Sequence, residues 1–182
     1  EAVRFLAELK ADRGARDALR WNRIAALQAD SGAEEAQRAA RLALERNAVE
    51  QALPWIRRLA RQETLSAEDV DLLARYLVAR GQMRRAWQFL NIQREKGTLS
   101  AESEGLRIRL GLSMNSLEIQ EGCIAELRED MERGNEAGRE AATLAITFAY
   151  VPDMDRVAAA EYLAGDANAT PEQRGLALAF LH

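Results

Sequence analysis

The chain has 182 residues, of which 48% are hydrophobic and only 5% are aromatic, and its formal net charge is −4. This acidic balance leaves no basic excess to neutralise a phosphate backbone, which makes nucleic acid a poor partner. Many good helix formers and only three prolines indicate an all-α chain with an interior of alanine and leucine.

Apolar residues at helical spacing, together with capping patterns, predict a run of helices. In chain order they cover 1–12, 15–29, 32–46, 49–62, 67–80, 83–96, 101–113, 116–132, 136–150, 154–164 and 171–181. Three helix starts carry a capping hydroxyl followed three residues later by an acidic or amide residue, at Ser31, Ser66 and Thr170. Because the links are short, consecutive helices are expected to form antiparallel hairpins.

Landmarks of the sequence return at a fixed interval. An alanine recurs at equal spacing, at Ala18, Ala52 and Ala86. The string TLSAE recurs at the same interval, at Thr64–Glu68 and Thr98–Glu102. A turn residue does so too, at Asn47, Gly81 and Asn115. A period of about 34 residues is typical of helical repeat arrays, which offer long surfaces and usually act by binding.

The residues within one period resemble the tetratricopeptide repeat (TPR) family. One helix carries large and small apolar residues in that family's order, a turn follows, and the next helix supplies a small and a large residue. These positions are Val70, Leu73, Ala74, Leu77, Gly81, Ala86 and Leu90. The resemblance implies a right-handed superhelical solenoid of antiparallel helix pairs, with first helices lining a concave groove. Alanine at 18, 52 and 86 would let the two helices of a pair cross closely.

The resemblance covers residues 1–115 well and fades over 116–182. Gln120 stands where the small residue of the second helix is expected. The later segment is therefore expected to form divergent repeats or C-terminal capping helices of the same solenoid.

Three arginines recur at the repeat interval on the predicted concave side, at Arg41, Arg75 and Arg109. Guanidinium groups bind carboxylates bidentately, so this arginine ladder would suit an anionic segment of a protein partner. Glutamates recur at the same interval, at Glu34, Glu68 and Glu102. Pairing of each arginine with such a glutamate is the alternative, and the two roles can coexist.

Other conspicuous residues favour structural roles. The tryptophans fall in second helices, at Trp21, Trp55 and Trp87, where inter-repeat packing is expected; an exposed tryptophan would instead suit a sugar ring or a partner. The single Cys123 allows no internal disulfide and is expected to be buried. The charged stretch 126–133 is expected to form a solvated helix face.

Catalysis has little support in the sequence. The only histidine is the terminal His182, which removes Ser–His and Cys–His arrangements, and no glycine-rich phosphate loop occurs. We therefore expect no catalytic residue, no metal site and no cofactor.

A narrower resemblance concerns the stretch 83–100, which is similar to the periplasmic repeat region of Pel-type exopolysaccharide export outer-membrane proteins. That resemblance implies a periplasmic fragment of a larger protein that recruits a polysaccharide-modifying enzyme and makes no membrane contact itself. No apolar run approaches the length that spans a bilayer. Exposed repeat ends would also permit self-association.

Two other functions stay open at this point. One is a cytoplasmic regulator whose TPR groove binds a peptide. The other is a groove that binds polysaccharide directly. A helical repeat that reads RNA is the least favoured, because the isoelectric point is about 5.3.

Overall fold

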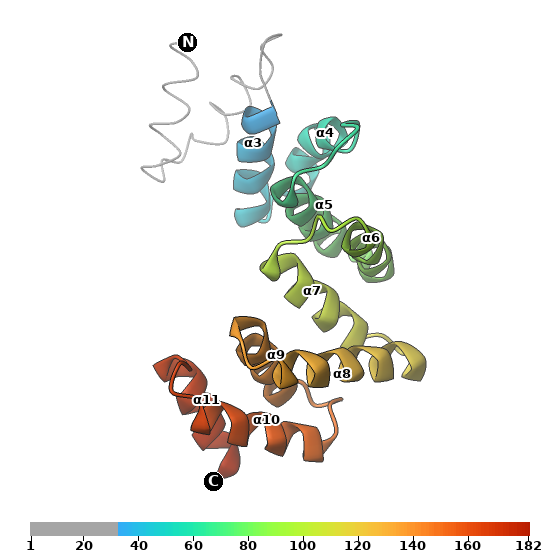
Figure 1. The fold of residues 1–182 in the computed structure, drawn as a ribbon. Helices are drawn as coiled ribbons and strands as arrows, with labels where there is room; N and C mark the ends of the chain where they lie inside the picture. Colours follow the sequence, from blue (N-terminus) through green and yellow to red (C-terminus); the bar gives the residue numbers. More distant parts are fainter. Residues whose placement is uncertain (1–32) are drawn as a thin grey trace. The chain divides into compact units, whose positions relative to one another are not determined.

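A computed structural model of the chain describes residues 33–182 (Figure 1). Every regular element there is an α-helix. The helices are α3 (Ala33–Glu45), α4 (Val49–Leu59), α5 (Ala67–Ala79), α6 (Met83–Glu95), α7 (Ala101–Leu112), α8 (Leu117–Glu132), α9 (Glu136–Thr147), α10 (Asp153–Gly165) and α11 (Pro171–Leu181). The expectations for helices 1–12 and 15–29, Ala18, Trp21 and Ser31 lie outside the described residues.

The all-α prediction and the helices expected from position 32 onward are confirmed, with ends shifted by a few residues. The helix starts also carry the sequence period. First helices begin at the repeat interval, at Ala33, Ala67 and Ala101. Second helices keep the same interval, at Val49, Met83 and Leu117. Helices α9 to α11 begin slightly later than this interval would place them, so the period loosens where the sequence resemblance fades.

The turns after α3 and α5 have the same backbone geometry. Asn47 and Gly81 have positive φ angles of 55° and 71°. Beyond each of them the chain turns back, and the next amide donates to a carbonyl in the last turn of the helix: Ala48 to Ala43 and Gln82 to Leu77. This arrangement ends a helix with a left-handed residue. Asn115 does not adopt a positive φ, so the predicted turn repeats in geometry only twice.

Two predicted helix caps are confirmed. The Ser66 hydroxyl accepts from the amide of Asp69 at 3.2 Å, and the Asp69 carboxylate accepts from the amide of Ser66 at 2.9 Å. Thr170 and Gln173 make the same reciprocal pair at the start of α11, with bonds of 3.2 and 3.0 Å. Each cap satisfies amides that the first helical turn leaves without partners.

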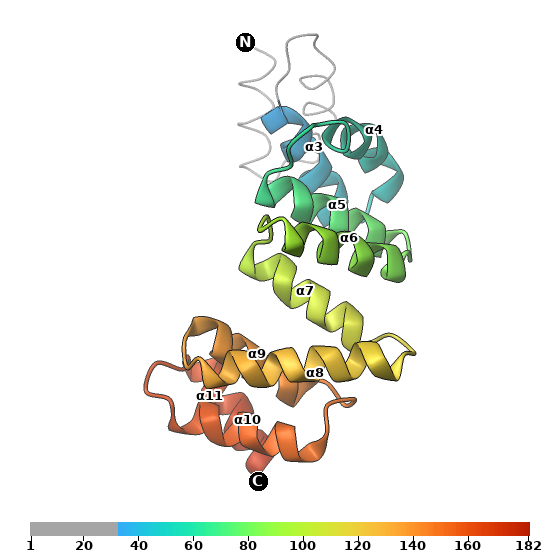
Figure 2. The same cartoon turned by 45° about the vertical axis from the view of Figure 1, so that its right-hand side comes forward.

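The chain divides into two compact units, the first ending at Ser103 and the second running from Glu104 to His182. In the first unit, α3 packs against α4, α5 packs against α6, and α5 also contacts α3 and α4 (Figure 2). The core of this unit combines the alanines of α3 with larger residues of α4 and α5. Its buried members are Ala36, Ala39, Ala40, Ala43, Ala52, Trp55, Ile56, Leu59, Leu72, Leu73 and Tyr76.

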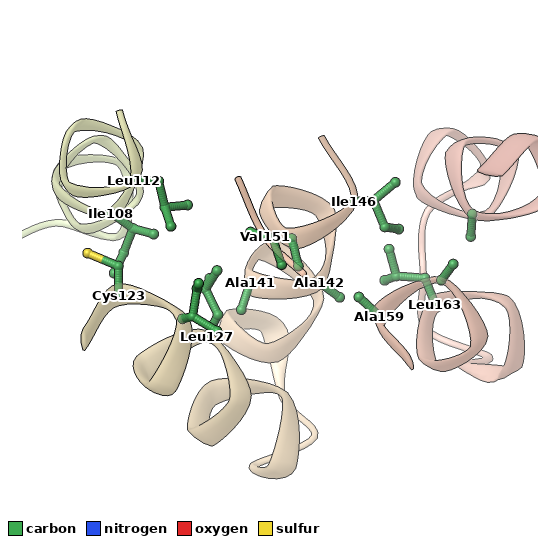
Figure 3. Close-up of a cluster of buried hydrophobic side chains, with 14 of the residues drawn as sticks. Ile108, Leu112, Cys123, Leu127, Ala141, Ala142, Ile146, Val151, Ala159 and Leu163 are labelled. Atoms are coloured by element: carbon green, nitrogen blue, oxygen red, sulfur yellow. The ribbon is translucent and has the colours of Figure 1, made fainter. Parts of the chain in front are cut away.

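The second unit gathers α8, α9, α10 and α11 around its own cluster, to which the end of α7 contributes. Figure 3 shows this cluster, with Cys123 and Leu127 of α8 near Ile108 of α7. Leu163 of α10 lies among alanines of α9 and α10 and is fully buried. The expected burial of Cys123 is confirmed.

The small repeat positions that the structure describes are buried. Ala52 and Ala86 are both fully buried, and their helices pack on α3 and α5. Gln120, the departure at the next such position, has a different task. Its side-chain amide donates to the carbonyls of Leu112 at 3.1 Å and Met114 at 2.8 Å. It therefore satisfies carbonyls that the end of α7 leaves open.

The other predicted structural positions differ in burial according to their place in the repeat. Leu73, Ala74 and Leu90 are buried, and Leu77 is half-buried. Gly81 is exposed at its turn, where it supplies backbone conformation rather than packing.

Candidate binding groove

The first unit contains a hollow of about 650 Å³ between its first helices. Its walls come from α3, α5 and the start of α7, and no residue of α4 or α6 lines it. The lining residues are Arg41, Leu44, Glu45, Ala67, Glu68, Asp71, Leu72, Arg75, Ala79, Ser100 and Glu102. We call this hollow the first-helix groove. It includes two of the three arginines singled out in the sequence.

The first-helix groove has apolar residues among charged ones. Leu72 is buried and Leu44 is half-buried, while Arg41 and Arg75 remain about half exposed. This contrast follows from the helical period. Leu72 and Arg75 are three residues apart on α5, close enough to share one face with different depths of burial.

Both groove arginines are engaged with carboxylates of the protein. Arg41 forms an ion pair with Glu68. Arg75 forms one with Glu102, and its Nε lies 2.7 Å from Asp71 Oδ2. Arg41–Glu68 and Arg75–Glu102 are the same pair one repeat apart, each joining a first helix to the next one. The alternative of internal pairing therefore describes these two arginines, and the partner is the glutamate of the following helix pair.

A second polar pair recurs beside these ion pairs and was not expected from the sequence. The Gln37 amide donates to Asp69 Oδ1 at 3.0 Å, and one repeat later the Ser103 hydroxyl donates to Asp71 Oδ1 at 3.5 Å. Asp69 and Ser103 are buried. The signal in the sequence was the return of polar residues at equivalent positions of successive repeats, Gln37 with Asp71 and Asp69 with Ser103. Such pairs fix the register of neighbouring first helices, because buried polar groups need their partners.

Neighbouring carboxylates act on the pKa of Arg75. Partial burial by itself would lower the pKa of Arg75, but the hydrogen bonds and charges of Asp71 and Glu102 outweigh burial and raise the pKa above its ordinary value. Its guanidinium group is bonded to two carboxylates of the protein, those of Asp71 and Glu102.

The charge balance of the first-helix groove is acidic. Two guanidinium groups face four carboxylates, those of Glu45, Glu68, Asp71 and Glu102. Glu45 makes no ion pair with another described residue. The anionic segment expected in this groove stays a prediction that no contact tests, and the local charge favours the opposite sign.

Arg109, the third member of the ladder, belongs to the second unit. Its side chain is exposed on α7 and makes no ion pair with another described residue. Arg41 and Arg75 thus line one groove of the first unit, whereas Arg109 is a residue of the second unit and does not line it.

Arg107 is a buried charge that the sequence reasoning missed. Only 1% of its side chain is exposed, and it pairs with Glu104 at 2.7 Å and with Glu126 of α8. Burial by itself would lower the pKa of Arg107, but hydrogen bonds to these two glutamates and their charges raise it. The signal was available, because Arg107 follows Leu73 by one full repeat interval and stands at a core position of the repeat.

The expected solvated helix face over 126–133 is wrong for Glu126. This residue is half-buried and pairs with Arg107. The rest of that stretch is closer to the prediction: Arg133 pairs with Asp130 at 2.7 Å on the exposed surface. Arg128, however, reaches across to Asp155 of α10 at 2.7 Å.

The tryptophans stay outside the first-helix groove. Trp55 is buried in the core, as packing predicted, and Trp87 is half-buried with its Nε1 lacking a hydrogen-bond partner. None of the described residues that line this groove is aromatic. Across residues 33–182 no group of acidic, histidine or cysteine side chains has the arrangement of a metal site. No described helix is long and apolar enough to cross a membrane.

Comparisons of the chain with protein-family models, curated proteins and solved structures gave no match. The TPR and Pel-type resemblances therefore stay predictions.

Proposed function

We propose that the chain is a non-catalytic scaffold for protein interactions, built as a TPR-like right-handed superhelical solenoid. The first-helix groove binds a segment of the partner protein. One observation carries this proposal: first helices that begin at the repeat interval present equivalent side chains to a single hollow of about 650 Å³. A repeated surface of this kind suits an extended segment, because successive residues of the segment meet equivalent positions.

The make-up of the groove supports binding of a peptide. Leu44 and Leu72 offer apolar contact, and the charged side chains around them offer orientation. Ligand sites commonly combine apolar walls with a few polar groups that fix the pose. The ion pairs of Arg41 and Arg75 also hold α3, α5 and α7's first turn in register, which prepares the groove before the partner arrives.

The cellular setting of this scaffold is proposed from the resemblance of residues 83–100. In that setting the chain is the periplasmic repeat region of an exopolysaccharide export machine, and the segment belongs to a polysaccharide-modifying enzyme. A cytoplasmic peptide-binding regulator is the alternative that the same groove would serve. A direct polysaccharide groove is less favoured, because the part of the hollow that the structure describes has no aromatic ring in its lining.

Site-directed photocrosslinking tests the proposal. Ala79→Cys places a thiol on an exposed residue of the groove, where a benzophenone maleimide can be attached. The labelled chain is irradiated with periplasmic and cytoplasmic fractions of a bacterium that encodes it. We expect a discrete protein adduct identified by mass spectrometry, from the periplasmic fraction under the export proposal and from the cytoplasmic fraction under the regulator.

Gln88→Cys is the matched control, because Gln88 is an exposed residue of α6 outside the groove. The unaltered chain controls for labelling of the buried Cys123. An adduct of equal yield from both introduced cysteines would contradict binding in the groove. An adduct of carbohydrate in place of protein would move the function to the polysaccharide alternative.

A further inference from the structure

We infer that the first-helix groove selects a cationic segment, one that carries lysine or arginine, rather than the acidic segment that an arginine ladder suggests. This inference rests on the proposed function and adds the charge of the partner. Its basis is the disposition of the six charged groups that line the groove.

Acidic groups outnumber basic groups in the described lining. Among residues 33–182, four carboxylates and two guanidinium groups line the hollow, and the other described lining residues are uncharged: Leu44, Ala67, Leu72, Ala79 and Ser100. The formal charge of the lining is therefore −2. A hollow with walls of low polarity focuses such a charge on whatever enters it.

Both arginines of the groove are already in ion pairs with carboxylates of the protein. Arg75 lies between Asp71 and Glu102, and Arg41 lies against Glu68. An incoming carboxylate would have to displace these partners and would face the remaining acidic groups. Like charges brought together at an interface are strongly unfavourable, which makes an acidic segment the wrong partner.

Three carboxylates of the groove can accept further hydrogen bonds. Glu45 has no ion pair with another described residue, and it lies on the wall of the groove. Glu68 and Glu102 each bond their arginine through one oxygen, and their side chains are 43% and 65% exposed. A carboxylate offers two oxygens with about four lone-pair sites, so these groups can accept further donors.

The apolar part of the groove fits the same occupant. Leu44, Leu72, Ala67 and Ala79 lie among the carboxylates. Lysine and arginine have long aliphatic stems that cover apolar surface while the charged head stays with polar groups. A segment with basic residues between small apolar ones would satisfy both parts of the lining.

The test uses the full chain and three fluorescent peptides of equal length. They are identical except that alternate positions hold lysine, glutamine or glutamate. Fluorescence anisotropy at low and at physiological salt should rank their affinities as lysine above glutamine above glutamate. The preference should weaken with salt, because partly exposed charges are screened.

Two matched variants locate the binding. Glu45→Gln removes a carboxylate from the groove, and Glu95→Gln makes the same change in an exposed residue outside it. Each is the last residue of its helix, so the effect on the helix end is the same. We expect Glu45→Gln to weaken the lysine peptide by about two- to fivefold, as for a partly exposed ion pair. Glu95→Gln should leave the affinity unchanged.

Arg75→Gln separates the two signs of charge. It makes the groove more acidic, so the lysine peptide should bind more tightly, and unchanged or weaker binding of the lysine peptide to the folded variant would overturn the inference. Circular dichroism confirms that the variant is folded. If folding is lost, Arg41→Gln makes the same distinction, because Glu68 is the one ion-pair partner of Arg41 among residues 33–182.

The outcomes are distinct. Tightest binding of the glutamate peptide would overturn the cationic inference and leave the proposed groove intact. Equal weakening by Glu45→Gln and Glu95→Gln would show diffuse attraction to the surface and overturn the inference. Binding of none of the three peptides would overturn both the inference and the proposed function.

Discussion

Glycine serves two different purposes in this chain, and the structure tells them apart. Gly81 has a φ of +71°, a conformation that residues with a Cβ rarely adopt, and beyond its two chain neighbours no described atom lies within 4 Å of where a Cβ would be. Gly122 has equally open surroundings but lies within α8. The first glycine is needed for the backbone of its turn, while the second only weakens its helix.

Opposite effects on stability are therefore expected for the same substitution. Gly81→Ala should lower the free energy of unfolding by about 1–2 kcal/mol, the strain of a left-handed residue. Gly122→Ala should raise it by about 0.5–1 kcal/mol, because alanine restricts the unfolded chain and favours helix. Urea denaturation followed by circular dichroism measures both. Destabilisation by both variants to the same extent would contradict this distinction.

Arg107 makes a second prediction at the level of the residue. Its side chain is buried with two carboxylates, so removing the guanidinium leaves negative charges near the core. Arg107→Ala should lower the free energy of unfolding by about 3 kcal/mol, the low end for a broken buried pair because both glutamates keep some exposure.

The replacement Arg107→Leu controls for lost volume. It restores the apolar residue that the repeat has at Leu73, so it should recover part of the stability lost in Arg107→Ala. Denaturant titration of both variants distinguishes charge from packing. A wild-type midpoint for Arg107→Ala would mean that the pair contributes nothing to stability.

At the level of the helix pair, α6 packs against α5 and carries the small side chain of Ala86. This side chain is fully buried. Ala86→Leu should overpack the contact and lower the free energy of unfolding by about 1–3 kcal/mol. Gln88→Leu, an exposed substitution on the same helix, should change it by less than about 0.5 kcal/mol. Thermal melts of the two variants compare them directly, and equal melting temperatures would argue against a tight crossing.

Elements were predictable from the sequence where their cause is local. The apolar spacing of α5, the Ser66 cap and the turn at Gly81 each depend on a few neighbouring residues, and all three were found as expected. Gln120 was recognised as a departure, but its bonds to Leu112 and Met114 depend on how α8 folds back on α7. The position of α8 against α7 cannot be predicted from any short segment of the sequence.

The groove illustrates the same limit for the candidate site. The repeat interval placed Arg41 and Arg75 on first helices, and both line the hollow. The sequence left open whether each guanidinium was available or paired. The answer lay in glutamates 27 residues further on, which reach back from the next helix pair. Contacts over that separation depend on stacking rather than on local pattern.

At the scale of the whole molecule, the described residues hold two separate hydrophobic clusters, one in each unit. Leu163 is fully buried in the second cluster and Leu59 in the first. Within each unit, helices contact those close to them in the sequence. Chains with such short-range contacts open in segments, because each element depends on its neighbours.

Hydrogen exchange should reveal this segmentation. Leu163→Ala should cost about 2–5 kcal/mol and accelerate amide exchange chiefly in α9 to α11. Leu59→Ala, the equivalent truncation in the first unit, should accelerate exchange chiefly in α3 to α5. Mass spectrometry of peptic fragments reads out both. Uniform acceleration throughout the chain by either variant would instead indicate one cooperative unit.

Alanine is the commonest residue among the buried apolar side chains described here, and helix α3 buries four of them. Each alanine removes little apolar surface from water, yet it loses almost no side-chain freedom on folding. Because the heat capacity of unfolding grows with the apolar area exposed, such a core should give a low heat capacity change for the chain's size. The free energy of unfolding should then vary little with temperature, so the fold would be about equally stable in cold and in warm conditions.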